Sequence, residues 1–404
     1  MRLAPEITPK MLALFGSTLP RHVLRTLERT PLKAMVYADD AATPSCCVIH
    51  LGSSLYFGGD ITPERFAYVK DRILTFEVYE KYGAFRFDLR ALNRKGRAPD
   101  EKDVLQAVRR HLPQAESAAR VPRGGSTYVY RVKTASETYY ARFLPEAASF
   151  AAEATAHEIM HAISVRVPRI VAFEHREERS GLSMMLAEEI PGASMEEKWP
   201  EQSADVILRE AGRQLALMHT IPVDGFGWID RGSHDALKGE KRSFLEYFDD
   251  YLADDLICLR HYGFTDSEQS QIRNYMEQAR RLLDVPQAVL VHGDFDTTHI
   301  FHAAGQFTGF IDFGEIRGSN RLFDLAVFAY NDRSPDRTAY YHLVDGYREA
   351  AWLTGGDLFT VELMALLILL RYAGKKVAQV EKKPQNDHWY RLIQKQLKRM
   401  EGTL

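Results

Sequence analysis

One segment, from Val291 to Phe313, constrains the fold and the chemistry of this chain more than any other. It reads VHGDFDTTHIFHAAGQFTGFIDF and follows the apolar run Ala288 to Val291, which has the length and composition of a buried strand. Gly293, between two polar residues, indicates that the chain leaves this strand for a loop. The pattern therefore predicts that Asp294 lies at the end of a buried strand.

The remainder of the segment has the pattern of a β-hairpin. Two extended arms, His299 to Phe301 and Phe307 to Phe313, flank a short turn around Ala304-Gly305-Gln306. If the turn is centred between Gly305 and Gln306, residues equidistant from that point are cross-strand neighbours, and His299 faces Asp312. The sequence thus predicts two potential metal ligands on one face of a hairpin.

These side chains have the chemistry that phosphoryl transfer needs. The reaction requires a carboxylate that orients the attacking hydroxyl and ligands that hold Mg²⁺ against the phosphates. Asp294 can fill the first role, and His299 and Asp312 can fill the second. Mg²⁺ prefers oxygen ligands, so imidazole is a less usual choice than an amide oxygen. The alternative interpretation is an ordinary hairpin with polar ends, but the spacing of the three residues favours a site.

The stretch VHGDFDTTHIF followed by FIDFGE resembles the catalytic and metal-binding loops of the aminoglycoside phosphotransferase family, kinase-like enzymes that phosphorylate hydroxyl groups of small molecules. The resemblance implies that Asp294 is the catalytic base and that His299 and Asp312 bind the metal. That family usually has asparagine five residues after the catalytic aspartate, whereas macrolide and 2''-aminoglycoside phosphotransferases resemble this chain in having histidine there. The resemblance also implies that Asp324, at the start of a helix, supports the catalytic loop.

An upstream segment, Pro122 to Phe143, has the pattern of a nucleotide-binding lobe. Alternating apolar residues predict two paired strands, and Gly124 and Gly125 precede the first. Glycines allow backbone amides to approach phosphate oxygens closely. The spacing places Arg142 on the second strand opposite Val129, and the resemblance implies that this arginine contacts phosphates and pairs with a helical glutamate.

The partner glutamate lies in an alanine-rich segment that predicts a helix from Pro145 onward. The resemblance implies Glu153, and Glu158 is the competing candidate. Further along, Gly181 to Gly192 predicts a strand that ends in a hinge, and the family recognises the purine through this backbone. The sequence does not distinguish ATP from GTP as the phosphate donor. The residues that the resemblance implies for nucleotide binding are Gly124, Gly125, Ser126, Val129, Arg142, Glu153, Glu188, Glu189 and Ile190.

Candidate substrate contacts are acidic. Asp296 and Glu315 flank the proposed catalytic and metal-binding residues, and Asp250 and Asp254 lie on one face of an amphipathic helix predicted for Leu245 to Leu256. A solvated acidic face is the simpler interpretation of that helix. Clustered carboxylates would attract a polycationic aminosugar, whereas the aromatic residues nearby suit a macrolide, and the sequence does not choose between them.

Composition is that of an ordinary globular protein, with 404 residues, 45% hydrophobic and 26% charged residues, and a formal net charge of -3. This charge gives no reason to expect nucleic acid or a membrane surface as a partner. Three cysteines do not make a disulfide framework and fit a reducing cytoplasm. The longest apolar run, Leu363 to Leu370, is too short to span a bilayer.

Residues 1–112 lie in front of the kinase-like part and predict a small α/β domain. Expected strands are Ala34 to Asp39, Cys46 to His50 and Ser54 to Phe57, expected helices are Pro63 to Ile73 and Asp100 to Arg110, and expected joints are Asn93 to Lys102 and Pro113 to Pro122. Met35 to Phe66 weakly resembles part of an acetyltransferase-like domain. A structural, dimerising or pocket-capping role is the favoured interpretation, and a bifunctional acetyltransferase and kinase is the alternative.

The sequence therefore predicts an α+β, two-lobed protein-kinase-like fold behind the N-terminal domain, with a nucleotide lobe at residues 115–190 and a helical lobe at residues 191–404. The expected protein is a cytoplasmic, Mg²⁺-dependent kinase that transfers the γ-phosphate of ATP or GTP to a hydroxyl of an aminoglycoside- or macrolide-like antibiotic. The alternatives are a kinase of a small metabolic alcohol or sugar derivative and a catalytically silent nucleotide-binding protein. The oligomeric state stays open.

Overall fold

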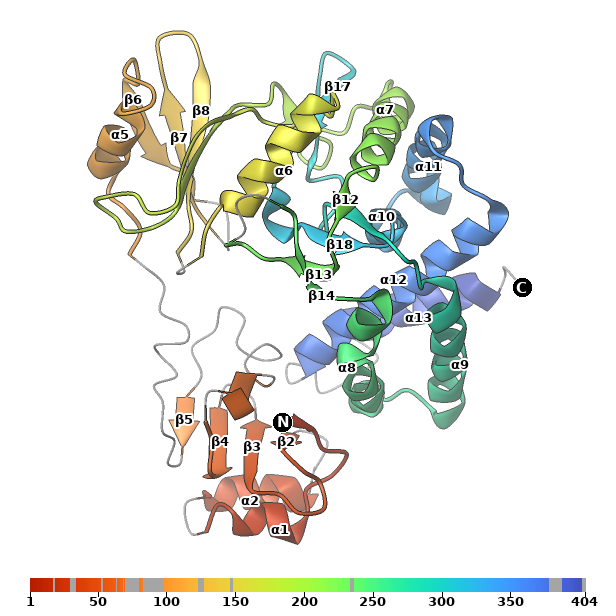
Figure 1. Ribbon diagram of the computed structural model, residues 1–404. Coiled ribbons are helices and arrows are strands. Elements are labelled where there is room, and N and C mark those ends of the chain that lie inside the picture. Colours follow the sequence, from red (N-terminus) through yellow and green to blue (C-terminus); the bar gives the residue numbers. More distant parts are fainter. Residues whose placement is uncertain are drawn as a thin grey trace. The chain divides into compact units, whose positions relative to one another are not determined.

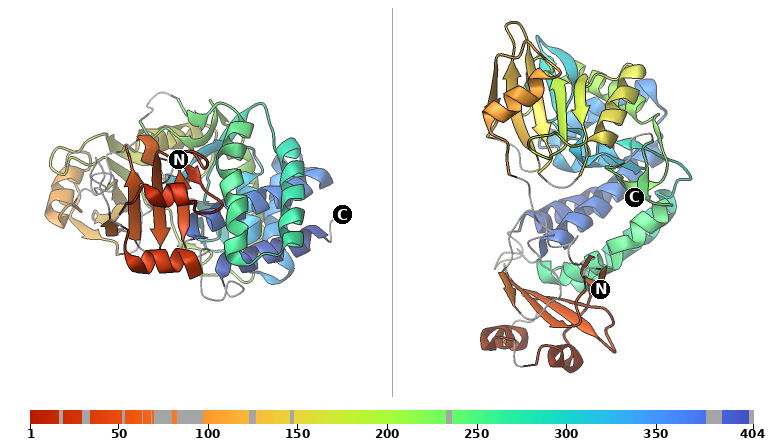
Figure 2. Two further views of the ribbon diagram at one scale, coloured as in Figure 1. Left: turned by 90° about the horizontal axis from the view of Figure 1, so that it is seen from below. Right: turned by 60° about the vertical axis from the view of Figure 1, so that its left-hand side comes forward.

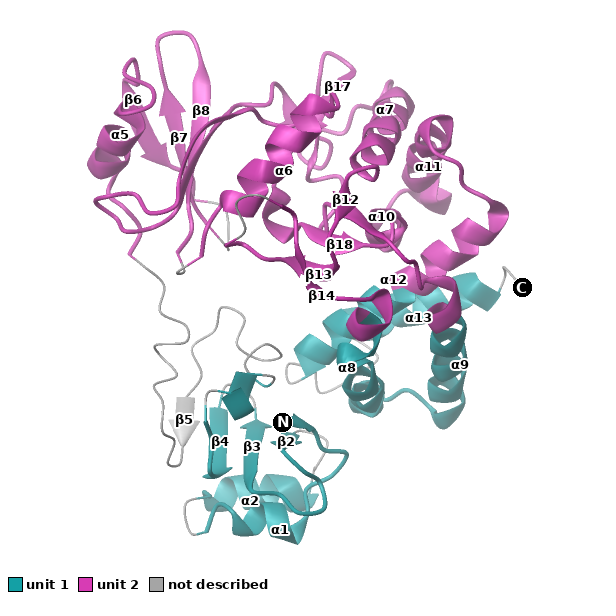
Figure 3. Ribbon diagram, in the orientation of Figure 1, with its two compact units in different colours: residues 1–94, 248–278, 366–404 teal, residues 95–247, 279–365 magenta. Residues whose placement is uncertain are grey.

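The chain divides into two compact units in the computed structural model (Figure 3). Unit 1 contains residues 1–94, 248–278 and 366–404, and unit 2 contains residues 95–247 and 279–365. The structure describes residues 1–16, 19–29, 34–51, 54–62, 64–67, 69, 80–82, 97–122, 127–145, 148–232, 236–377 and 387–401.

The N-terminal part of unit 1 is a five-stranded sheet with two helices on one face (Figures 1 and 2). Its order is β1-β2-β3-β4-β5, with β5 parallel to β4 and the other pairs antiparallel. The elements are β1 (Arg2–Leu3), α1 (Pro9–Ala13), α2 (Arg21–Arg29), β2 (Met35–Ala38), β3 (Cys46–Leu51), β4 (Ser54–Gly59) and β5 (Glu80–Tyr82). The three predicted strands are confirmed, and the predicted helix Pro63 to Ile73 lies largely outside the described residues.

Helices from later in the chain complete unit 1. They are the greater part of α8 (Phe244–Cys258), the 3-10 turn η2 (Leu259–Tyr262), most of α9 (Asp266–Leu282), the end of α12 (Gly355–Lys376) and α13 (His388–Glu401). Within the unit, the amide of Leu3 donates to the buried carboxylate of Asp254 at 3.2 Å, and Arg260 donates to the carbonyl of Pro5. A backbone donor buried this way needs its acceptor, so Asp254 ties β1 to α8.

Unit 2 begins with an antiparallel sheet of order β6-β7-β8-β10-β9 (Figure 1). Its strands are β6 (Ser117–Arg120), β7 (Tyr128–Lys133), β8 (Thr138–Phe143), β9 (Ile170–Glu174) and β10 (Met184–Glu188). Val129 pairs with Arg142 across β7 and β8, as predicted. Alternation puts Tyr130 and Phe143 on the buried face, where their rings meet edge to face at 5.8 Å.

Residues before this sheet pack with it. Helix α5 (Glu101–Arg109) places Val104 and Val108 in one core with Tyr130 of β7. The sequence predicted this helix as part of the N-terminal domain. In the structure it belongs to unit 2, which starts at residue 95. The predicted joint Pro113 to Pro122 is wrong, because it contains β6, the first strand of the sheet.

Helix α6 (Ala151–Ala162) covers the sheet but begins later than its alanine-rich sequence predicts. The prediction started the helix at Pro145. The hydroxyl of Ser183 accepts the amide of Phe150 at 3.1 Å, and the hydroxyl of Ser149 accepts the amide of Ala151 at 3.1 Å. These side-chain acceptors satisfy the free amides of a first helical turn, so the helix starts where they lie.

Two further sheets, and three helices that lie wholly in unit 2, build most of the rest of its described residues. The sheets have the orders β11-β16-β17 and β12-β15-β18-β13-β14. Their strands are β11 (Ala193–Ser194), β12 (Pro222–Val223), β13 (Phe226–Ile229), β14 (Gly239–Lys241), β15 (Ala288–Val291), β16 (Ile300–Ala303), β17 (Gln306–Phe310) and β18 (Arg317–Ser319). The helices are α7 (Ala204–Met218), α10 (Phe323–Asn331) and α11 (Thr338–Ala350), with 3-10 turns η3 (Phe313–Glu315) and η4 (Pro335–Arg337).

Helices α7 and α11 approach closely through two glycines. A methyl group on Gly346 would lie 1.8 Å from the carbonyl oxygen of Arg209, and one on Gly212 would lie 2.1 Å from the carbonyl oxygen of Leu343. Both obstacles are backbone atoms, which cannot rotate away as a side chain can. The crossing of these two helices therefore requires glycine at both positions.

We expect Gly346→Ala to lower the free energy of unfolding by about 1–2 kcal/mol, because overpacking a fixed helix contact costs about 1–3 kcal/mol, which exceeds the gain in helix propensity of about 1 kcal/mol. Chemical denaturation measures the change. Gly355→Ala is the matched control, since a methyl group there meets nothing within 4 Å. Equal stability of the two variants would contradict the close approach.

No described helix of either unit is both long enough and apolar enough to cross a membrane.

Candidate active site

The loop that carries Asp294, the candidate catalytic loop, leaves β15 through a glycine that no other residue can replace without strain. Gly293 has φ +85°, and a side chain there would start 2.0 Å from the carbonyl oxygen of Glu315. The predicted strand Ala288 to Val291 is confirmed, and Asp294 follows its end as a half-buried residue. The sharp turn at Gly293 thus directs Asp294 out of the sheet.

A buried hydrogen-bond network holds the start of this loop. The carboxylate of Asp324, in the first turn of α10, accepts the amides of His292 at 2.7 Å and Gly293 at 2.9 Å. It also pairs with Nε2 of His219 at 3.0 Å, and Nδ1 of His219 lies 2.9 Å from the Tyr347 hydroxyl. Burial raises the pKa of Asp324, but the bond and charge of His219 outweigh burial and keep it below its usual value. Asp324 is therefore a carboxylate that holds the start of the candidate catalytic loop, the structural role that the resemblance implied.

His292 is a neutral structural histidine. Its Nε2 donates to the carbonyl of Ile311 at 2.9 Å, and its Nδ1 accepts the amide of Asp294 at 3.4 Å. Burial lowers its pKa below the usual value. Its ring lies 4.8 Å from that of Phe313, which lies 4.9 Å from the ring of His157 on α6. This stack fixes the position of Phe313 and hence of Asp312 beside it.

Arg142 of β8 joins the first sheet of unit 2 to the hairpin that ends at Asp312. Its guanidinium pairs with Glu153 on α6 and lies 3.3 Å from Oδ1 of Asp312. Glu153 is buried, whereas the competing candidate Glu158 is exposed, so the structure selects the predicted partner. Burial lowers the pKa of Arg142, but the charges of Glu153 and Asp312 raise it above its usual value, and the arginine is charged.

The hairpin brings His299 and Asp312 together, but not through the predicted register. The turn is Ala304-Gly305, both with positive φ, and a bulge between Phe301 and His302 shifts the pairing. His299 therefore faces Ile311, whose amide donates to its carbonyl at 3.2 Å. Asp312 is one residue further on. Its left-handed backbone, with φ 62°, turns the side chain back, so that its Oδ2 lies 3.9 Å from Nε2 of His299.

The two side chains fit a divalent cation with six ligands. Ligands about 2.1 Å from Mg²⁺ lie about 3 Å apart when adjacent and about 4.2 Å apart when opposite, so 3.9 Å needs only a small adjustment. Among the described residues, no three His, Cys, Asp or Glu side chains gather to hold an ion. Phosphate and water oxygens would complete the shell, as is usual for Mg²⁺.

The Asp312 carboxylate is ionised. Partial burial raises its pKa, but the positive charge of Arg142 is the largest of the effects that outweigh burial and hold the pKa below its usual value. Its side chain is 52% exposed, so it reaches toward the space that a ligand would occupy. A metal at this position would have a charged oxygen donor at neutral pH.

The other predicted nucleotide residues are only partly placed. Gly124, Gly125 and Ser126 lie outside the described residues. Glu188 ends β10, and its amide donates to the carbonyl of Arg169 at 2.9 Å, while the amide of Glu189 donates to that of Thr138 at 3.2 Å. A purine bound through either amide would have to replace these bonds. The side chain of Ile190 packs near Gly309 of β17.

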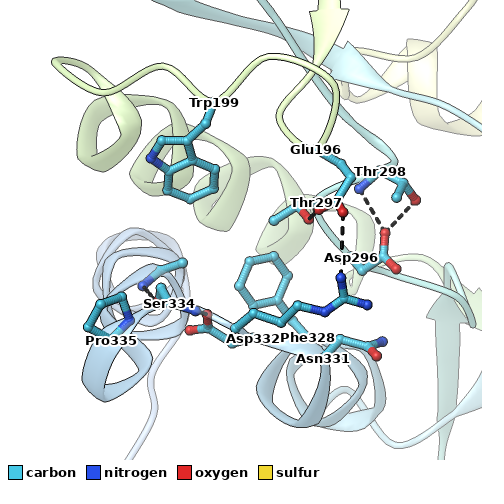
Figure 4. A pocket seen from close by; sticks show the side chains of 12 residues that line it. Glu196, Trp199, Asp296, Thr297, Thr298, Phe328, Asn331, Asp332, Ser334 and Pro335 are labelled. Atoms are coloured by element: carbon cyan, nitrogen blue, oxygen red, sulfur yellow. Dashed lines mark hydrogen bonds and ion pairs between the residues drawn. The ribbon is translucent and has the colours of Figure 1, made fainter.

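A cavity of about 350 Å³ opens beside the catalytic loop (Figure 4). Asp296 lines it, as expected for a substrate contact. The sequence analysis missed the other walls, which come from the loop after β11 and from the end of α10, because loop residues give no periodic signal. The missed residues include Glu196, Trp199, Phe328 and Asp332.

The carboxylates of this cavity differ in their surroundings. Asp332 accepts hydrogen bonds from the amides of Ser334 at 2.7 Å and Tyr340 at 2.8 Å. Both of its oxygens are therefore already engaged by the backbone. Glu196 accepts the Thr297 hydroxyl at 3.2 Å and lies 3.7 Å from the guanidinium of Arg333, which is 87% exposed. An exposed pair of this kind is weak, so Glu196 can exchange Arg333 for a cationic ligand.

The remaining predicted substrate residues do not line this cavity. Glu315 pairs with Arg317 at 3.3 Å in η3 and β18. Asp250 and Asp254 belong to α8 in unit 1, where Asp254 binds the amide of Leu3. A role for Glu315, Asp250 and Asp254 in substrate binding stays a prediction.

A sheet lobe and a helical lobe that meet at one carboxylate, through a buried arginine–glutamate pair, form the arrangement of kinase-like phosphotransferases, which act on hydroxyl acceptors. The chain belongs to the phosphotransferase enzyme family (APH), whose sequence model matches residues 117–358. It is therefore a small-molecule kinase of that family.

Solved structures share this fold at low sequence identity. Aminoglycoside phosphotransferase APH(4)-Ia, as a thermostable mutant in a ternary complex with AMP-PNP and hygromycin B, is 12% identical, with a TM-score of 0.54 over 74% of this chain and 97% of that one. Macrolide 2'-phosphotransferase MphH from Brachybacterium faecium is 14% identical, with a TM-score of 0.52 over 74% of this chain and 96% of that one. The predicted family and fold class are confirmed.

Proposed function

We propose that this protein transfers the γ-phosphate of ATP or GTP to a hydroxyl of an amine-bearing antibiotic of the aminoglycoside or macrolide type. The main support is the continuity of the catalytic loop with the cavity, since Asp294 is two residues from Asp296 in the cavity wall. An acceptor in this cavity would therefore lie next to Asp294. Solved structures of similar fold include an enzyme bound to hygromycin B and a macrolide phosphotransferase, which agree with this class of acceptor.

In the proposed reaction, Asp294 orients the acceptor hydroxyl and takes its proton as the oxygen attacks the γ-phosphorus. A bond forms between the hydroxyl oxygen and phosphorus, and the bond to the bridging oxygen of the nucleoside diphosphate breaks. Arg142 contacts the phosphates and is held by Glu153. A divalent cation, when bound by His299 and Asp312, would offset the charge on the phosphate oxygens.

A screen of the purified full-length protein tests the function. Labelled ATP and GTP are each incubated with Mg²⁺ or Mn²⁺ and with aminoglycosides, macrolides and small metabolic alcohols. Label on an antibiotic hydroxyl is the expected result. Label only on a metabolic alcohol would overturn the antibiotic assignment, and nucleotide binding without any transfer would indicate a catalytically silent protein.

We expect Glu196→Gln to raise KM for an amine-bearing acceptor about tenfold, because a hydrogen bond to a charged group contributes about 1.5–3 kcal/mol. The change in KM for a neutral N-acetylated analogue should be much smaller, and kcat should be nearly constant. Steady-state kinetics with both acceptors provides the comparison. Glu201→Gln is the control, since Glu201 is on the same loop but does not line this cavity. Equal effects on both acceptors would exclude recognition of the amine by Glu196.

A further inference from the structure

The ring of His299 is held in one orientation by its neighbours. The backbone of His299 is fixed on both sides. Its amide donates a hydrogen bond to the carbonyl of Asp296 at 3.2 Å, and its carbonyl accepts one from the amide of Ile311 at 3.2 Å. The imidazole is 13% exposed and lies 5.2 Å from the ring of His292. The ring therefore has little freedom to turn, and its two nitrogens face different groups.

Nδ1 of His299 faces two acceptors. The Thr298 hydroxyl lies 3.3 Å from Nδ1, and Oδ1 of Asp296 lies 3.5 Å from it. The hydroxyl hydrogen of Thr298 is already committed, because this hydroxyl donates to the same Asp296 oxygen, as Figure 4 shows. Thr298 can then only accept from the imidazole. These contacts favour the tautomer with hydrogen on Nδ1.

The opposite nitrogen is consequently a lone-pair donor. Nε2 faces Oδ2 of Asp312 at 3.9 Å, and neither atom of this pair carries a hydrogen in the favoured tautomer. Two acceptors directed at each other repel unless a cation lies between them. An imidazolium with hydrogen on both nitrogens would also relieve the repulsion, and the experiment must separate these two states.

We propose that Asp296 and Thr298 are positioning residues that present Nε2 of His299 to the metal, and that this centre prefers Mn²⁺ over Mg²⁺. The inference rests on the proposed phosphoryl-transfer site. Imidazole is a borderline ligand that suits transition metals, whereas Mg²⁺ favours oxygen donors. A carboxylate behind a metal-binding histidine fixes its tautomer and the orientation of its ring, as the Asp296 contact would do here. Asp296 then has a second role besides lining the cavity.

The test measures metal binding directly, with Mn²⁺ and AMP-PNP added to the full-length protein. Electron paramagnetic resonance gives the Mn²⁺ affinity, and competition with Mg²⁺ gives the preference. Electron spin-echo spectra report a nitrogen bound to Mn²⁺, and protein labelled with the heavy nitrogen isotope separates histidine from adenine nitrogens. We expect a nitrogen signal from the protein and a preference for Mn²⁺ of about tenfold or more.

Variants assign the roles. His299→Asn should abolish the nitrogen signal and reduce the preference for Mn²⁺ about tenfold, because an amide oxygen replaces the imidazole. Asp296→Asn and Thr298→Val should retain the signal but weaken Mn²⁺ binding about tenfold, the lower end of the 10–100-fold range for such outer contacts. Thr297→Val is the control, since the Thr297 hydroxyl donates to Glu196 instead, and its Mn²⁺ affinity should not change.

Three results would overturn the inference. Mn²⁺ bound with the nucleotide but without a protein nitrogen signal would show that His299 is not a ligand, and would leave the proposed function intact. Equal preference in the wild type and His299→Asn would show that the imidazole does not select the ion. Absence of any nucleotide-dependent Mn²⁺ binding would overturn both this inference and the metal role in the proposed function.

Discussion

Asp294→Asn is expected to reduce kcat about a thousandfold while the protein stays folded and binds nucleotide with nearly unchanged affinity. The substitution keeps the size of the side chain but removes the group that accepts the proton, and a positioned base contributes about 10²–10⁴-fold. Asp294 is half-buried at a loop position, so the amide fits in the same space. The loss should therefore lie in the chemical step.

Single-turnover transfer of labelled phosphate to the acceptor found in the screen measures this step, and a nucleotide titration measures binding. Asp284→Asn is the matched control, because Asp284 is exposed just before β15. It should retain wild-type kcat. If Asp294→Asn keeps more than about a tenth of the wild-type rate, Asp294 is not the base. The proposed mechanism would then need another group.

Local sequence patterns were sufficient for the parts of the site that lie on regular strands. The apolar run Ala288 to Val291 predicted β15, and alternation around a short turn predicted the pairing of Val129 with Arg142. In both cases one face of the strand is buried, and a slip of one residue would expose that face, so the register is strongly specified.

Local patterns did not predict the register of the hairpin. Ala304 has a left-handed backbone, which alanine rarely adopts, so nothing in its identity placed the turn at Ala304-Gly305. The bulge at Phe301 and His302 is likewise set by packing. The approach of His299 to Asp312 was correctly predicted, but from a wrong register, because the left-handed turn at Asp312 brings its side chain back.

The acceptor cavity had no signal in the sequence. Glu196 and Trp199 come from the loop after β11, and Phe328 and Asp332 come from α10 and its end. These segments meet only through the tertiary fold, and each residue alone reads as an ordinary loop or core position. Periodicity describes how a segment faces its core, not which distant loop lies opposite.

Asp324→Ala is expected to lower the free energy of unfolding by about 3–5 kcal/mol, because it removes one partner of a buried pair and leaves its donors without an acceptor. Those donors are the amides of His292 and Gly293 and Nε2 of His219. Chemical denaturation measures the change. Asp357→Ala is the matched control, since Asp357 also lies in the first turn of a helix but accepts a single backbone amide, that of Thr354, at a half-buried site. Its loss should be about 1 kcal/mol.

The same substitution should reduce kcat even at temperatures where the variant is fully folded, because the catalytic loop loses the acceptor that fixes its first two amides. Hydrogen exchange followed by mass spectrometry separates this local effect from general destabilisation. Peptides covering residues 288–299 should exchange faster in Asp324→Ala, while peptides from β7 and β8 should be unchanged at equal folded fraction. Uniform acceleration across unit 2 would mean that Asp324 stabilises the lobe as a whole and does not position Asp294.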